Sequence, residues 1–68
     1  MTINKMKFEI AMAREAVTKT EISKRAGVSR GRLNVILNSK NVTPIVAGRI
    51  ATALNTDITE IERKENNL

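Results

Sequence analysis

The chain has 68 residues, of which 41% are hydrophobic and only one, Phe8, is aromatic. A chain of this length forms one domain with one small core, which we expect to be built from aliphatic side chains. The sequence contains no cysteine and no histidine. This composition excludes disulfide bridges, Cys- or His-ligated metal sites and histidine-based acid–base catalysis. We therefore expect no cofactor, no metal and no enzymatic activity.

No segment approaches the roughly 20 consecutive apolar residues that a membrane span requires. Residues 1–7 lack the apolar stretch and the small-residue cleavage site of a secretory signal peptide. We therefore expect a soluble, intracellular protein without a membrane partner.

The positive charge is concentrated in one part of the chain. The net charge of +5 arises from 12 basic and 7 acidic residues. Residues 19–40 hold six of the basic residues and one acid, Glu21, so that the remainder of the chain is neutral. A basic balance confined to one segment favours a polyanionic partner, with an ordinary solvated surface as the alternative.

The first predicted helix covers residues 4–16. Apolar residues recur at helical spacing along most of the chain, and no strand-like alternation occurs. In this first helix the steps of four, three and four place one set of apolar residues on a common face: Met6, Ile10, Ala13 and Val17. We interpret Met6, like Met1 and Met12, as part of the core.

Two short helices joined through a glycine are expected next. The first covers about residues 20–26, with Thr18 or Thr20 as its N-cap. Gly27 follows and can adopt the left-handed conformation that ends a helix. Ser29 then caps a helix over residues 30–38. The side chains expected to face inward from this pair are Ile22, Ala26, Leu33, Ile36 and Leu37.

The remaining chain predicts two further helices. Thr43 and Pro44 are the N-cap and first residue of a helix with Ala47, Ile50, Ala51 and Leu54 facing inward, and Asn55 can end it. Asp57 caps a fifth helix, with Ile58 and Ile61 packed back on the core. Residues 62–68 form a polar tail. We therefore expect one domain over residues 1–68, with a folded core of about 4–61.

The segment KTEISKRAGVSRGRLNVILN, residues 19–38, is typical of a helix-turn-helix. It resembles the Cro/CI-type, or XRE-type, regulators of phages and bacteria. The resemblance covers about residues 6–61 and includes AGVSR at 26–30, IATAL at 50–54, and the residues that follow, to Ile61. It implies an all-α, compact five-helix bundle, a lambda-repressor-like DNA-binding domain. Such a domain binds a double-stranded DNA operator in the cytoplasm, at the nucleoid.

The outer face of residues 30–38 is the expected base-reading surface. At 100° per residue, the side opposite the buried residues carries Arg30, Gly31, Asn34 and Val35. Arg30 suits guanine, Asn34 suits adenine, and Val35 suits a thymine methyl group. Gly31 either permits close approach to DNA or is a local weakness in the helix. Phosphate contacts are expected from Lys19, Thr20, Arg32, Asn38, Lys40, Asn41 and Thr43.

These features predict a sequence-specific DNA-binding transcriptional regulator, and we favour repression over activation. One alternative is a protein-interaction module, such as an antirepressor or an antitoxin-like partner. Another is an architectural or excision factor that binds DNA to shape it. The polar outer face of residues 30–38 argues against an interaction module, which would expose apolar side chains there.

A weak homodimer that is strengthened on DNA is the expected assembly. Regulators of this type commonly place two recognition helices in successive major grooves, about 34 Å apart. The sequence offers little apolar surface for pairing beyond the stretch from Asp57 onward, where the apolar residues are Ile58, Ile61 and Leu68. We expect no effector domain after the bundle, so that regulation acts through dimer affinity, expression level, proteolysis or a separate partner.

Overall fold

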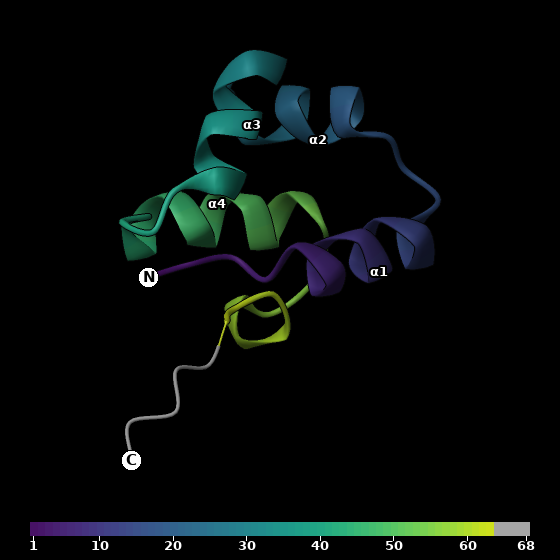
Figure 1. Cartoon of the computed structure of the whole chain (residues 1–68). Coiled ribbons are helices and arrows are strands. Elements are labelled where there is room, and N and C mark those ends of the chain that lie inside the picture. Colours follow the sequence, from purple (N-terminus) through teal and green to yellow (C-terminus); the bar gives the residue numbers. More distant parts are fainter. Residues whose placement is uncertain (64–68) are drawn as a thin grey trace.

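Helices form most of the protein in the computed structural model, which describes residues 1–63. The elements in chain order are α1 (Lys5–Glu15), α2 (Lys19–Ala26), α3 (Arg30–Asn38), α4 (Pro44–Ala53) and a 3-10 helix, η1 (Ile58–Glu60). Figure 1 shows α2 and α3 together at one end of the molecule, α4 across the middle, and α1 with η1 at the other end. Within residues 1–63, no helix is long and apolar enough to cross a bilayer. The predicted all-α class is confirmed.

Each α-helix begins at a side chain that caps it. The side-chain oxygens of Asn4, Thr18, Ser29 and Thr43 each accept a hydrogen bond from the backbone N–H three residues later. Pro44 occupies the first position of α4, where the missing N–H costs nothing. The expected caps at Ser29 and Thr43 are therefore confirmed. Of the two threonines proposed for α2, Thr18 is the cap.

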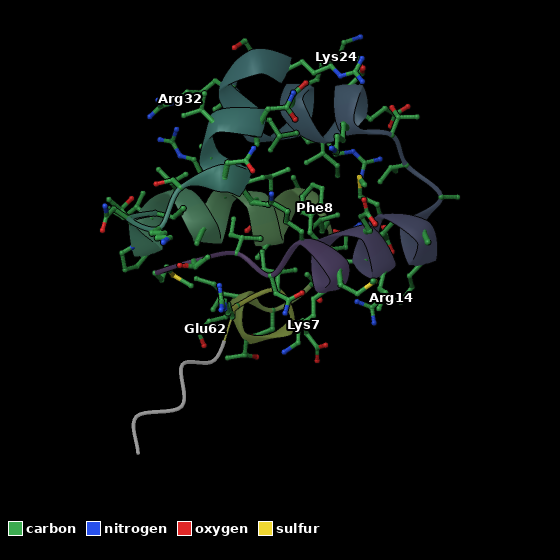
Figure 2. All side chains as sticks on the ribbon, viewed as in Figure 1. Lys7, Phe8, Arg14, Lys24, Arg32 and Glu62 are labelled. Carbon is green, nitrogen blue, oxygen red and sulfur yellow. The ribbon has the colours of Figure 1, made fainter. Side chains whose placement is uncertain are left out.

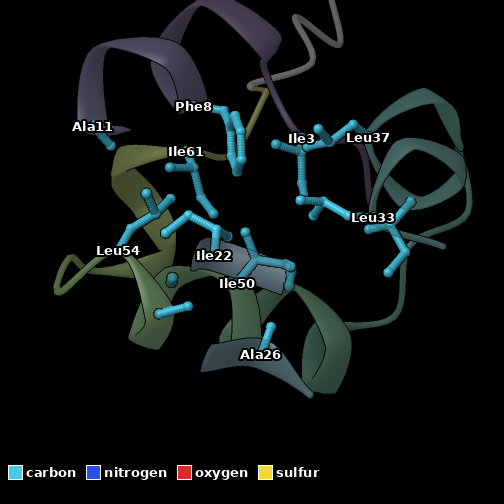
Figure 3. Packing of buried hydrophobic residues seen from close by; sticks show 14 of the residues in the cluster. Ile3, Phe8, Ala11, Ile22, Ala26, Leu33, Leu37, Ile50, Leu54 and Ile61 are labelled. Carbon is cyan, nitrogen blue, oxygen red and sulfur yellow. The ribbon is translucent and has the colours of Figure 1, made fainter. Parts of the chain in front are cut away.

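The core lies between the helices and is almost wholly aliphatic. The helix α4 packs against both α2 and η1, and α2 packs against α3. Figure 3 shows side chains from all four α-helices, together with Ile3 and Ile61, in one cluster. Its largest fully buried members are Phe8, Ile3, Ile22, Leu33, Ile50, Leu54 and Ile61. The inward faces expected for α2, α3 and α4 are all buried.

The face of α1 that enters the core differs from the expectation. Phe8 and Ala11 are buried, and Met12 packs against the cluster. Met6 and Ile10 are instead 66% and 57% exposed. The helix carries two apolar faces on opposite sides, and the aromatic ring of Phe8 fills more of the core than either aliphatic side chain could. The interpretation of Met6 as a core residue was wrong.

The expected fifth α-helix is a single 3-10 turn. Asp57 caps this turn. Its carboxylate oxygen Oδ1 accepts one hydrogen bond from the backbone nitrogen of Thr59 and one from Thr59 Oγ1, each at 2.9 Å. Ile61 is fully buried and Ile58 packs against the core. Their spacing of three residues matches the 3-10 repeat. The chain then turns to pair Glu62 with Ile3, which stops the helix from continuing.

The N-terminal segment is held between two distant parts of the chain. Ile3 and Glu62 form an isolated antiparallel bridge, flanked by hydrogen bonds from Asn4 N to Ile61 O and from Arg63 N to Thr2 O. The amino group of Met1 donates to the carbonyl of Val42, 2.9 Å away. Ordered contacts therefore extend beyond the expected limits of 4 and 61 at both ends. The rest of the expected tail, residues 64–68, lies outside the described residues.

Candidate DNA-binding surface

The turn between α2 and α3 is fixed by glycine and serine. Gly27 has φ of +72°, the left-handed region that an L side chain enters only with strain. Its N–H donates to Lys24 O, and the next N–H, of Val28, donates to Ser23 O. These two bonds close α2 in the manner of a left-handed cap. Ser29 then starts α3 at once, so the two helices are joined by a three-residue turn.

Helix α3 divides cleanly into a buried side and an exposed side. Leu33, Ile36 and Leu37 face the core. The predicted base-reading residues all lie on the exposed side: Arg30, Gly31, Asn34 and Val35. Val35 is 57% exposed although it is aliphatic, which leaves its methyl groups free for an apolar contact. The structure therefore places these four residues on the outer surface, as the helical periodicity predicted.

One hollow joins the start of α1, the start of α2 and the outer face of α3. It has a volume of about 100 Å³, and its polar lining includes Lys5, Lys19, Asn34 and Asn38. Lys5 donates a hydrogen bond to Asn38 Oδ1, and Asn38 Nδ2 donates to Asn34 O at 2.8 Å. The expected residues Lys19, Asn34 and Asn38 are thus brought together. Their basic neighbour Lys5 was missed, because its distance along the chain from α3 hides its place in space.

A second hollow lies on the other side of α3, against the loop to α4. Its volume is about 120 Å³, and its lining includes Arg32, Val35, Asn41 and Thr43. The backbone N–H of Asn41 donates to Ser39 Oγ, at 3.0 Å, which shapes the loop. Four of the predicted contact residues are therefore adjacent here. Lys40 is exposed in the same loop but does not line the hollow.

The remaining predicted residues lie at the margins. Arg30 and Gly31 form the exposed first turn of α3 and border neither hollow. Thr20 is exposed on the first turn of α2, and its carbonyl accepts a hydrogen bond from Ser23. Figure 2 shows Arg32 and Lys24 projecting from the end of the molecule that α2 and α3 form. The candidate surface therefore extends over this end.

The charge on this surface is almost uncompensated. In the part of the chain that the structure describes, the one ion pair joins Arg25 to Glu21 along α2, at 3.4 Å. Glu21 is the sole acid within residues 19–40. Glu9 of α1 lines the first hollow and reduces the positive potential there. The loop residue Lys40 and the α3 arginines keep their charges without a paired carboxylate within residues 1–63.

The described residues contain no cluster suited to a metal. Among residues 1–63, no group of three or more acidic side chains is placed to hold an ion. The surface is thus a cationic and amide-bearing face with one exposed valine, a composition suited to phosphates and base edges.

Comparison with known protein families identifies the same architecture. The family model HTH_3, described as helix-turn-helix, matches residues 10–61, which is most of the chain. No curated protein and no solved structure gave a significant match. The match covers α2, the turn at Gly27 and α3, where the geometry above is found. The chain belongs to the XRE-type helix-turn-helix family of DNA-binding transcription regulators.

Proposed function

We propose that this protein is a sequence-specific transcriptional repressor and that it reads the major groove of operator DNA with α3. The observation that carries the proposal is the outer face of α3, where Arg30, Asn34 and Val35 are all exposed while the opposite face is buried. A major groove about 12 Å wide admits one α-helix. The three side chains supply the three kinds of base-edge contact: a bidentate cation, a bidentate amide and a methyl contact.

Flanking residues support the proposal because cationic and polar side chains lie on both sides of α3. Lys5 and Lys19 border the hollow on one side of α3, and Arg32 and Thr43 border the hollow on the other. These four residues supply phosphate contacts on both sides of the recognition helix, α3. Such contacts set the register and orientation of the protein, whereas the outer face of α3 discriminates sequence.

Selection of bound fragments from a random double-stranded pool tests the proposal directly. We expect enrichment of one short motif, and loss of preference at one base pair in the variant Arg30→Ala. The matched control is Lys40→Ala, which removes a loop cation and should weaken binding to all sequences about equally. Enrichment of no motif would contradict sequence-specific reading.

The salt dependence of binding tests the phosphate contacts separately. If about five phosphates are neutralised per copy, log K should fall with log[salt] with a slope of about −4 to −5 per half-site. A flat response would argue for the protein-interaction alternative. Repression is tested with a reporter whose promoter overlaps the selected motif: expression should fall when the protein is supplied, and an increase would indicate activation.

A further inference from the structure

We propose that the groove between α2 and α4 is a docking site for an acidic segment of a partner protein, one that carries a large apolar side chain among its carboxylates. The groove has a volume of about 510 Å³ and shares no lining residue with the two hollows beside α3. Its lining combines two arginines, one isoleucine and three small residues: Arg25, Arg49, Ile45, Ala26, Gly27 and Gly48.

The exposed side of α4 forms one wall of the groove. The residues that line it recur at helical spacing, opposite the buried side of the helix: Ile45, Gly48, Arg49 and Thr52. Ile45 is 74% exposed, more than any other large hydrophobic side chain within residues 1–63. A Cβ atom added at Gly48 would meet no atom within 4 Å, so open space lies one turn from Ile45. This wall therefore offers an apolar contact and room for a side chain of the partner.

The C-terminal end of α2 forms the other wall. Arg25 Nη1 donates a hydrogen bond to the carbonyl of Ala53, at 3.1 Å, which anchors the guanidinium across the two helices. Arg25 Nη2 lies 3.4 Å from the carboxylate of Glu21, one turn back on α2. Both side chains of this pair are about half exposed, so solvent screens it. Because a guanidinium carries five N–H donors, Arg25 keeps donors for a second carboxylate.

The charges around the groove favour an acidic partner. Arg49 is the one charged residue of α4, and it has no ion-pair partner among residues 1–63. Arg25 and Arg49 therefore set two guanidinium groups against a single acid, Glu21. Arginine binds a carboxylate through paired N–H donors. A second copy of this chain carries a net charge of +5, and this charge makes it a poor occupant.

The open shape of the groove favours a protein segment over a small molecule or DNA. Pockets for small molecules bury most of the ligand surface, whereas Gly27, Ile45 and Arg49 are all exposed here. A DNA backbone presents phosphates to the arginines but no apolar group to Ile45, since thymine methyl groups lie in the major groove. A protein segment supplies carboxylates and an apolar side chain together.

A subtractive selection from a phage-displayed library of random peptides tests the groove on the full chain. Peptides retained by the unchanged chain are passed over the double variant Ile45→Gln/Arg49→Gln, and only those that it fails to retain are kept. We expect these to be enriched in Asp and Glu around a Leu, Ile or Phe. Both substituted side chains are exposed, so circular dichroism should show a folded double variant. A selection that keeps no peptide family, or one without acidic enrichment, would overturn the proposal.

The affinity of one selected peptide, synthesised with a fluorescent label, tests each part of the groove by anisotropy. Arg49→Gln and Ile45→Gln should each weaken binding at least about tenfold. Gly48→Gln should also weaken it, by filling the open space. The matched controls are Arg32→Gln and Ile10→Gln, which remove an exposed arginine of the candidate DNA-binding surface and an exposed isoleucine of α1, and neither should change the affinity. Equal losses for Arg32→Gln and Arg49→Gln would contradict the assignment.

DNA binding and self-association distinguish the peptide from other occupants. Arg49→Gln should bind the selected DNA motif as the unchanged chain does, and a salt slope lower by roughly one would instead make the groove a phosphate contact. Sedimentation equilibrium should give both proteins the same mass, and a lower mass for Arg49→Gln would identify a second copy as the occupant. Either result would overturn the proposal. If the unchanged chain binds no DNA motif, the proposed function fails, while the peptide affinities still decide the role of the groove.

Discussion

The ammonium group of Lys5, at the start of α1, is hydrogen-bonded to the side-chain amide oxygen of Asn38, at the end of α3. The same amide donates to the carbonyl of Asn34, one turn back on α3. Asn38 thus uses both ends of its amide within the protein. This arrangement holds a cation from the first helix beside the recognition helix, and we predict that Asn38 positions Lys5 there.

Replacing Lys5 with glutamine should weaken DNA binding to all sequences about equally and reduce the salt slope by roughly one. The reason is that one phosphate contact is lost while the base-reading face of α3 is unchanged. Lys7→Gln is the control, because Lys7 lies on the opposite edge of α1, in the groove beside η1. Fluorescence anisotropy over a range of salt concentrations measures both variants. Equal losses for the two lysines would contradict a specific role for Lys5.

Asn38→Ala should reproduce part of the Lys5→Gln loss, and the two losses should not add. Lys5 would remain charged in this variant but would no longer be held against α3. A double-mutant cycle on DNA affinity measures this coupling. Additive losses would show that Asn38 contacts DNA independently of Lys5.

Gly31→Ala distinguishes a functional glycine from a local weakness. Gly31 lies in the first turn of α3, and a methyl group added there would meet no atom of the protein within 4 Å. Alanine should therefore stabilise the fold, through its higher helix propensity, by up to the roughly 1 kcal/mol that the same change gives in a helix interior. If the variant is more stable in thermal unfolding and yet binds its site more weakly, the glycine permits close approach to DNA. Unchanged DNA affinity would assign Gly31 no role in recognition.

Replacing Phe8 with alanine should destabilise the protein far more than replacing Ile10, although the two residues are only two positions apart on α1. Phe8 is fully buried, and Phe8→Ala should cost about 3–5 kcal/mol of unfolding free energy through lost burial and the cavity left behind. That is a large share of the stability of so small a domain. Ile10→Ala removes an exposed side chain and should change stability by less than about 0.5 kcal/mol. Urea denaturation measures both, and similar losses would contradict the assigned faces of α1.

Asp57→Ala should destabilise the protein at neutral pH but not at low pH. Hydrogen bonds from the backbone and then the side chain of Thr59 hold the pKa of the Asp57 carboxyl below its ordinary value of 3.8. A carboxyl whose pKa is lowered in the folded state stabilises the fold above its unfolded pKa. This contribution is lost as the pH falls through the lowered folded-state value.

The unfolding free energies of Asp57→Ala and of the unchanged chain should therefore differ at pH 7 and converge as the pH falls below 3.8. Thr59→Ala removes only the hydroxyl donor and should show a smaller difference of the same sign. If the difference in unfolding free energy between Asp57→Ala and the unchanged chain is constant across this pH range, the charged carboxylate is not the cause of the difference.

The sequence by itself determined the features that depend on neighbouring residues. Ser29 and Thr43 cap helices because a short hydroxyl side chain reaches the N–H three residues on, and Gly27 ends α2 because it tolerates positive φ. The boundaries of α3 and its exposed and buried sides followed from these signals and the helical period. The exposed side of α3, which carries the candidate base-reading residues, could therefore be predicted from the sequence.

The tertiary structure decided what local pattern left open. Helix α1 has apolar residues on two sides, and only the shape of the core selects Phe8 over Ile10. The pairing of Ile3 with Glu62 limits η1 to a single turn. Lys5 joins α3 through Asn38 across 33 positions of sequence. Contacts between segments far apart in the chain depend on how the helices pack, and no spacing within one segment encodes them.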